Sequence, residues 1–439
     1  MFGRRMPFGA LAGGCVGAGA LARGRVRTDM KKNIRYSLLW LSCCLAMAFS
    51  AGAQVDTARH PIDTIRHQGD TAFLSPDTSR LQLAIFVPLY LDSAFDASDN
   101  YRYDKNFPKF LSPGLEFYEG AQMALDTMAK EHVSLDVRVY DTRGSLQQVL
   151  NDSLAHVGLI IGAVSNTTEL QQLAAAAAKR GVPFIDANYP NDGGITNNPS
   201  LVILNSTLRS HCEGIYRYVQ RNYPTKSLVY FGKSGVQEDR LKGYFTDLDK
   251  KTAGVPLKIK YVMLEDNFSV ADVAARLDSM TLTVCIAGSL DEVFGARLCQ
   301  VLAGLKSYQT KIIGMPTWDS QDWTKPEFAG EEIVYTTPFY INPGDTLVKS
   351  VQQVFKSRFY SRPSDMVFRG YETVYRFGHL LVLHGKDLNG SIGEKKFKVF
   401  NDFEITPVFL NRQTMTLDYF ENKKLYFIKN LDGTSMLVN

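Results

Sequence analysis

Val157–Ile161 (VGLII) is an uninterrupted apolar run of strand length, and with the residues after it this run decides the fold. The polar loop Gly162–Glu169 (GAVSNTTE) leads into a helical segment over 167–180, which contains five consecutive alanines, and a second apolar run occupies Val182–Ile185. Two parallel strands need a crossover of this length, and its helix covers one face of their sheet. The stretch predicts one β-α-β unit of an α/β fold.

The same alternation continues on both sides of this unit. Ser112 and Pro113 open a helix with a side-chain cap and with proline at the first position, where no N–H is needed. The other predicted strands are 81–87, 133–140, 201–204, 228–231, 257–263, 282–287, 311–314 and 333–336, and the predicted helices are 112–128, 145–155, 207–222, 236–250, 269–279, 292–305, 345–360 and 364–384. A terminal hairpin is predicted over 426–438. More than 200 residues of this pattern exceed one sheet, so we expect two Rossmann-like lobes with parallel sheets flanked by helices.

Positive charge is concentrated at the amino-terminal end. The chain has 439 residues and a formal net charge of +4, but residues 1–53 hold eight Lys or Arg and one Asp. The rest of the chain therefore has 41 basic and 44 acidic side chains. A slightly acidic body has no general attraction for nucleic acid or for anionic membranes, so we expect no nucleic-acid partner.

Residues 30–53 have the three parts of a secretory signal peptide. Met30–Arg35 is positively charged, Tyr36–Phe49 is apolar but too short to span a bilayer, and Ala51–Ala53 fits the small-residue cleavage rule. We expect cleavage before Gln54, a mature chain with no membrane span, and a periplasmic location.

The neighbouring segments have alternatives. Residues 1–29, rich in Gly, Ala and Arg, are either an extension that precedes the true start at Met30 or an authentic part of the protein. Cys43 and Cys44 make lipoprotein anchoring an alternative to simple cleavage, although the residues before them fit a lipid-attachment motif poorly. Residues 54–80 show no apolar periodicity and are predicted to be a flexible spacer.

Cys212, Cys285 and Cys299 are the cysteines of the predicted mature chain. An odd number argues against a disulfide framework, even in an oxidising compartment. Two interpretations stay open: all three are buried small apolar residues, or Cys285 and Cys299 form one bridge. The histidines show no metal-ligand spacing, and we expect neither a metal nor a cofactor.

The loops that follow the strands are the candidate ligand site, because in an open parallel sheet the crevice lies beyond the carboxyl ends of the strands. Helix amino termini there offer free N–H groups and a partial positive charge. Ser165, Asn166 and Thr167 fill one such loop, and a plain capping box with Glu169 is the alternative explanation of the same residues. An aromatic ring in these loops either floors a pocket or packs its own loop. The other candidates are Tyr90, Ala187, Asn188, Tyr189, Gln237, Ser289, Trp318 and Asp319.

Ten segments, in their order and spacing, resemble the type I periplasmic binding proteins, particularly the leucine/isoleucine/valine-binding branch that serves ABC importers. They are Phe117–Ala124 (FYEGAQMA), Asp136–Thr142, Gly162–Thr168, Ala174–Phe184, Phe268–Ser269, Ile286–Gly288, Ile313–Gly314, Trp318–Ser320, Tyr335–Phe339 and Gly370–Tyr375. The resemblance runs from Leu81 to Gly433. It implies two lobes with a three-strand hinge, a small-molecule ligand held by hinge closure, and an ABC permease as a partner of a monomeric protein.

The resemblance also implies where the chain crosses between the lobes, namely near Asn205, Thr336 and Phe397. The expected division is a signal peptide and spacer up to residue 80, a first lobe of 81–205 plus 337–396, and a second lobe of 206–336 plus 397–439.

By the same resemblance, Ser165, Thr167, Ala187 and Asn188 are expected to grip the carboxylate of a ligand. The sequence departs from the family at Asp186 and Asn188, where Ser and Thr are usual. The charge of Asp186 would repel a carboxylate, which weakens the expectation of an amino acid as the ligand.

Two other classes of function are alternatives to solute binding. An enzyme is disfavoured because no H-E-x-x-H, G-x-S-x-G or C-x-x-C pattern occurs, and Gly232–Ser234 lacks the earlier glycine that a phosphate-binding loop requires. An envelope-associated sensor or interaction protein is the alternative that keeps the fold without transport. We expect a solute-binding protein for a small polar ligand, such as an amino acid, and no catalysis.

Overall fold

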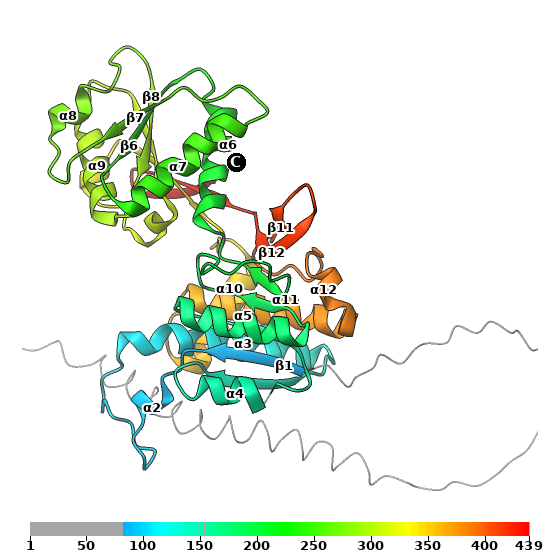
Figure 1. Cartoon of the computed structure of the whole chain (residues 1–439). Helices are drawn as coiled ribbons and strands as arrows, with labels where there is room; N and C mark the ends of the chain where they lie inside the picture. Colours follow the sequence, from blue (N-terminus) through cyan, green and yellow to red (C-terminus); the bar gives the residue numbers. More distant parts are fainter. Residues whose placement is uncertain (1–81, 153, 439) are drawn as a thin grey trace, which may run out of the picture.

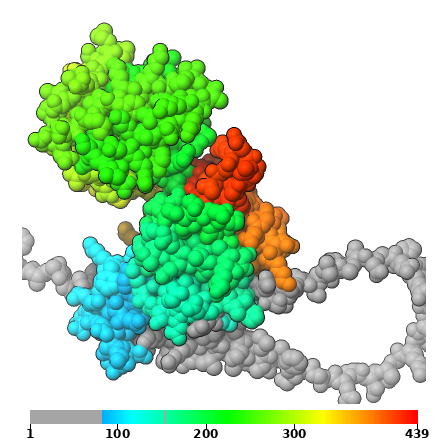
Figure 2. All heavy atoms as spheres, in the orientation of Figure 1, coloured from blue at the N-terminus to red at the C-terminus, as the bar shows by residue number. Residues whose placement is uncertain are grey.

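The computed structural model describes residues 82–152 and 154–438. The extension, signal peptide and spacer predicted for 1–80 lie outside the described residues. Two lobes, each built on a seven-stranded sheet, lie one above the other in Figure 1, and Figure 2 shows a narrow waist between them. The prediction of two α/β lobes is therefore confirmed.

The sheet of lobe 1 has the strand order β11-β12-β5-β4-β3-β1-β2. All neighbouring strands are parallel except β11, which is antiparallel to β12. β1, β3, β4 and β5 are buried along their whole length, as expected for strands covered by helices on both faces. The bounds are β1 Gln82–Val87, β2 Asp136–Asp141, β3 Val157–Gly162, β4 Phe184–Asp186, β5 Leu201–Ile203, β11 Ile405–Asn411 and β12 Thr416–Asn422.

Helices cover both faces of this sheet. The core on one face includes residues of α3, α10 and α11, and the core on the other face includes residues of α4 and α5. The bounds in lobe 1 are α2 Leu91–Ala94, α3 Ser112–Lys130, α4 Leu146–Asp152, α5 Thr167–Arg180, α10 Thr346–Phe359, α11 Asp365–His384 and α12 Leu388–Ser391.

Two glycines set the distance between α3 and α11. A Cβ on Gly120 would lie 2.0 Å from the carbonyl oxygen of Val367, and a Cβ on Gly370 would lie 2.1 Å from that of Phe117. Real Cβ atoms do not approach a carbonyl so closely, so any larger residue would push the helices apart. This contact fixes the first turns of α11, which reach the interface between the lobes.

The sheet of lobe 2 has the order β14-β13-β10-β9-β8-β6-β7. Its core on one face includes α6 and α7, and its core on the other includes α8 and α9. β13 and β14 form the predicted terminal hairpin, which is confirmed, and β13 is also antiparallel to β10. The bounds are β6 Ser227–Gly232, β7 Ile259–Met263, β8 Thr283–Gly288, β9 Thr310–Ile313, β10 Glu332–Thr337, β13 Tyr426–Leu431, β14 Thr434–Val438, α6 Leu208–Asn222, α7 Val236–Lys251, α8 Val270–Ala274 and α9 Glu292–Gly304.

The segment after residue 397 differs from the expected division. We assigned all of 397–439 to the second lobe, but β11 and β12 extend the sheet of lobe 1, and only the final hairpin belongs to lobe 2. The reason is a parallel pairing in which Phe420 of β12 lies opposite Val202 of β5. The chain therefore crosses between the lobes after Asn422 and not near Phe397.

Two predicted helices are shorter than expected, and the one predicted over 145–155 is Leu146–Asp152 in the structure. The helix predicted over 269–279 ends at Ala274, and a turn in which the Asp278 carboxylate accepts the Met280 N–H at 2.8 Å follows it. A search of residues 82–152 and 154–438 finds no helix with the length and apolar character needed to cross a membrane.

Candidate functional site

The loop after β3 is held mainly by its own capping interactions. The Asn166 side chain accepts the Glu169 N–H at 3.0 Å and so caps α5, while the Ser165 N–H donates to the Glu169 carboxylate at 3.2 Å. These are the contacts of the capping alternative weighed above. The loop still lies at the carboxyl edge of the lobe 1 sheet, as the parallel topology requires.

Arg143, in the loop after β2, contacts two residues of this cap, Ser165 and Glu169. Its guanidinium donates to the Ser165 hydroxyl, forms an ion pair with Glu169 at 3.2 Å, and lies 4.9 Å above the centre of the Tyr90 ring. The Ser165 hydroxyl and the Tyr90 ring therefore both have a partner from the chain itself. The sequence reasoning missed Arg143, although it follows directly from a strand end.

The loop after β4 is organised by Asp186, which is completely buried. One of its carboxylate oxygens accepts the N–H groups of Asn188 at 3.2 Å and Tyr189 at 3.0 Å, and the other has no partner among the described residues. The Tyr189 hydroxyl lies 2.6 Å from the Thr167 hydroxyl, which joins this loop to the loop after β3. Ala187, also buried, donates its N–H to the Gly162 carbonyl.

Arg369 in the first turns of α11 completes this arrangement. Its Nη1 donates to the Asn188 side-chain oxygen at 3.1 Å, and its guanidinium lies 4.0 Å from the centre of the Phe339 ring. Burial lowers its pKa, while the negative charges of Asp365, Asp319 and Asp186 raise it in opposition. Its Nε is buried and has no hydrogen-bond partner in the described part of the chain.

A cavity of about 210 Å³ lies at Arg369, between the two lobes. Lobe 1 contributes a guanidinium, a carboxylate, an amide and apolar side chains, and lobe 2 contributes a carboxylate, hydroxyls and one isoleucine. The lining residues are Phe339, Tyr340, Ile341, Asp365, Arg369 and Asn401 from lobe 1, and Asp319, Tyr335, Thr337, Ile428 and Ser435 from lobe 2. Because both lobes form its walls, a change in their angle must change its size.

Two carboxyl groups near this cavity have raised pKa values. Burial raises the pKa of Asp186 to about 8, and the two backbone N–H groups and Arg369 only partly oppose this. The pKa of Asp319 is raised first by loss of water around it and then by the negative charge of Asp365. The Thr337 hydroxyl, 3.2 Å from Asp319, acts in the opposite direction.

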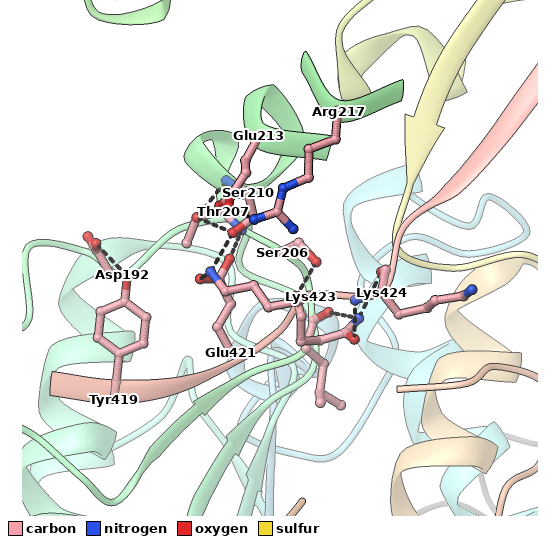
Figure 3. Close-up of polar contacts among 12 residues, drawn as sticks. Asp192, Ser206, Thr207, Ser210, Glu213, Arg217, Tyr419, Glu421, Lys423 and Lys424 are labelled. Atoms are coloured by element: carbon pink, nitrogen blue, oxygen red, sulfur yellow. Dashed lines mark hydrogen bonds and ion pairs between the residues drawn. The ribbon is translucent and has the colours of Figure 1, made fainter. Parts of the chain in front are cut away.

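The connections between the lobes carry a polar network, shown in Figure 3. The Glu421 carboxylate, only 1% exposed, accepts the Thr207 N–H at 2.7 Å at the start of α6 and forms an ion pair with Lys423. Lys423 also donates to the Ser210 hydroxyl at 2.7 Å. In Figure 3 the side chains of Glu421 and Lys423 both point toward α6. A residue of the lobe 1 sheet thus caps the first helix of lobe 2.

A second contact connects α6 with β10. His211 Nδ1 lies 2.8 Å from the Thr336 hydroxyl, and both side chains are buried. Burial lowers the pKa of His211 to about 4, so this imidazole is neutral near pH 7. Side-chain hydrogen bonds therefore hold the chain near all three crossings between the lobes.

Comparisons with known proteins place this architecture. The sequence matches no family model, and no curated protein sequence matches it. A solved structure from Rhodospirillum rubrum, assigned to a branched-chain amino acid ABC transporter, aligns with a TM-score of 0.60 and 12% identity over 81% of this chain and 99% of that one. The chain has the type I periplasmic binding protein fold.

Two further solved structures are similar to this chain. A branched-chain amino acid ABC transporter periplasmic ligand-binding protein from Burkholderia xenovorans aligns with a TM-score of 0.56 and 14% identity, over 82% of this chain and 94% of that one. Full-length LpoA from Haemophilus influenzae aligns with a TM-score of 0.52 and 16% identity, over 82% of this chain and 59% of that longer chain. At identities this low, the structural similarity shows the fold alone and does not identify the ligand.

The four site residues predicted in lobe 2 do not lie together. Only Asp319 lines the cavity. Trp318 is completely buried in the core of lobe 2, where its ring fills the space beside Gly314, so it packs the lobe and cannot floor an open pocket. Ser289 is also buried and donates to Glu238 at 2.7 Å, whereas Gln237 is exposed on α7.

The predicted residues of lobe 1 gather at one edge of their sheet, but Asn188 is the one that contacts a cavity residue directly. The sequence reasoning missed Arg369 and Asp365 because they start a helix far along the chain from the β4 loop. The available signal was Arg369 beside Gly370, on a helical face that also carries the charged residues Asp365, Glu372 and Arg376. In the described part of the chain, no cluster of His, Cys, Asp or Glu could hold a metal ion.

Proposed function

We propose that this chain is an exported solute-binding protein that captures a small polar ligand between its lobes. The observation that carries the proposal is at Arg369, which lines a cavity shared by both lobes and whose buried Nε has no partner among the described residues. An unpaired buried N–H costs about 1–3 kcal/mol, and a ligand oxygen that accepts this bond removes that cost. The cavity combines apolar and aromatic side chains with a few charged groups, as small-molecule sites do, and its volume of about 210 Å³ suits a compact ligand.

Hinge closure is the proposed mechanism. A ligand that contacts Arg369 from lobe 1 and Asp319 from lobe 2 binds the closed arrangement more tightly than the open one. It shifts the population by that difference in affinity. The bond between the Thr207 N–H and Glu421 joins the start of α6 in lobe 2 to β12 in lobe 1, and we expect the lobes to rotate about this connection.

The proposal extends to the role of the protein in the cell. It includes a periplasmic location, a monomeric state and an ABC permease that recognises the closed form. The predicted signal peptide and the fold shared with the ligand-binding protein of Burkholderia xenovorans support this part of the proposal. We propose binding without catalysis.

A thermal-shift panel of amino acids, short peptides, sugars and aromatic acids tests the proposal. At least one compound should raise the melting temperature of the wild-type protein and titrate with a stoichiometry of one in calorimetry. The variant Arg369→Met should keep a ligand-free melting transition but lose at least about tenfold in affinity for that compound, because the unpaired donor is gone. If no compound binds, or Arg369→Met binds as well as wild type, solute capture in this cavity is contradicted and the envelope interaction alternative gains support.

A further inference from the structure

We propose that the interlobe cavity selects an organic cation, a protonated amine with a neutral oxygen acceptor beside it, and not a ligand whose main anchor is a carboxylate. The inference rests on the proposed solute-binding function and specifies the charge of the ligand. It is carried by the charged groups that line the cavity and by the buried Nε of Arg369, which has no hydrogen-bond partner among the described residues.

The first step is the balance of charge. Among the lining residues, Asp319 and Asp365 carry carboxylates and Arg369 carries the guanidinium. Behind Arg369 lies a third carboxyl group, Asp186, which is buried and acts on the same guanidinium. Asp186, whose pKa burial raises to about 8, is protonated near neutral pH and adds no full charge. The positive charge of Arg369 is therefore opposed by Asp319 and Asp365, and a ligand carboxylate placed beside it would face two like charges.

The second step concerns the two carboxylates that come from opposite lobes. Asp319 lies on a short 3-10 helix of lobe 2 (Pro316–Ser320), and Asp365 is the first residue of α11 in lobe 1. Loss of water raises the pKa of Asp319 first, and the negative charge of Asp365 raises it further, so the two carboxylates repel each other across the cavity. A cation between them would relieve this repulsion and would draw the lobes together, whereas an anion would increase it.

The third step is the acceptor. The Nη1 of Arg369 donates to Asn188, and one face of the guanidinium lies over the Phe339 ring. The buried Nε has no hydrogen-bond partner among the described residues. A carbonyl or hydroxyl oxygen accepts such a bond without bringing a negative charge to the carboxylates. Tyr335 and Tyr340 also line the cavity and supply aromatic surface, which suits the apolar part of an amine or the amine itself.

The experiment compares charge on a fixed scaffold. For alanine, leucine and phenylalanine, calorimetry at pH 6.5 would measure binding of the free amino acid, the amino acid amide and the N-acetyl amide, which are zwitterionic, cationic and neutral. The proposal predicts that for at least one scaffold the amide binds at least about tenfold more tightly than the other two forms. Tighter binding of the free amino acid or of the N-acetyl amide would overturn it.

Two variants and a control assign the effect to the cavity. Asp319→Asn and Asp365→Asn should each weaken amide binding at least about fivefold and leave binding of the free amino acid equal or stronger. Asp247→Asn removes an exposed carboxylate that pairs only with Lys251 on the surface of α7, and should change neither. Equal losses for amide and free amino acid would refute the charge argument while leaving solute binding intact. Absence of binding by every compound in both panels would instead refute the proposed function.

Discussion

Replacing Asp186 by asparagine should make the stability of the protein much less dependent on pH. Asp186 is completely buried, and its pKa is raised from 3.8 to about 8 chiefly by burial. Between these values the folded protein retains a proton that the unfolded chain has released. This contribution to stability is complete below about pH 4 and is lost as the pH rises toward 8. The loss is about 1.4 kcal/mol per pH unit, so on the order of 3–4 kcal/mol between pH 5 and pH 8.

Asparagine mimics the protonated form of this side chain. Its oxygen can still accept the N–H groups of Asn188 and Tyr189, and its NH₂ group replaces the carboxyl oxygen that has no partner. The variant should therefore be similar to wild type at pH 5 and more stable than wild type at pH 8.

Urea denaturation followed by circular dichroism at pH 5, 6, 7 and 8 would measure the difference in free energy of unfolding. Asp247→Asn, which changes an exposed carboxylate, is the matched control and should parallel wild type at every pH. A difference between Asp186→Asn and wild type that stays constant from pH 5 to pH 8 would refute the assignment of a neutral, buried carboxyl group beside Arg369.

Three further predictions concern the hinge, the core of lobe 2 and the cysteines. Glu421→Gln weakens the charge-assisted bond to the Thr207 N–H, and should lower the free energy of unfolding by about 1–2 kcal/mol in urea; an unchanged midpoint would argue against this role. Trp318→Ala should lower the free energy of unfolding by about 3–5 kcal/mol because the ring packs the core, while ligand affinity at low temperature stays within about twofold. A large loss of affinity would show that Trp318 belongs to the ligand site. Cys285 and Cys299 are buried free thiols, so iodoacetamide should modify both only after unfolding, without reductant; a disulfide-linked peptide in mass spectrometry would contradict this.

The sequence was sufficient to predict the architecture because central parallel strands are continuous apolar runs. Val157–Ile161 lies within β3, and the strands on either side alternate with helices as predicted. The pattern failed at β11 and β12, where polar residues and Pro407 interrupt the runs. Their place in the sheet depends on pairing with β5, more than 200 residues earlier, and periodicity carries no information about such a partner.

The candidate site was predictable only in part, for a related reason. Asn188 and Asp319 were found because both follow strand ends, where parallel topology puts ligands. Arg369 and Asp365 reach the same place from the start of a helix, which only the packing of α11 against α3 determines. Trp318 directly precedes Asp319 but points into the core, because the short 3-10 helix turns the two side chains in different directions.

The most direct test of the account is the distance between the lobes with and without ligand. Spin labels at Lys105→Cys in lobe 1 and Val236→Cys in lobe 2 lie at exposed positions, whereas Cys212, Cys285 and Cys299 are buried and should not react. Pulsed dipolar spectroscopy on the chain from Gln54 onward would use the compound that the binding panels identify. We predict a shorter label distance with ligand and no change in the Arg369→Met background at the same ligand concentration. An unchanged distance at saturating ligand would contradict closure of the lobes on a solute.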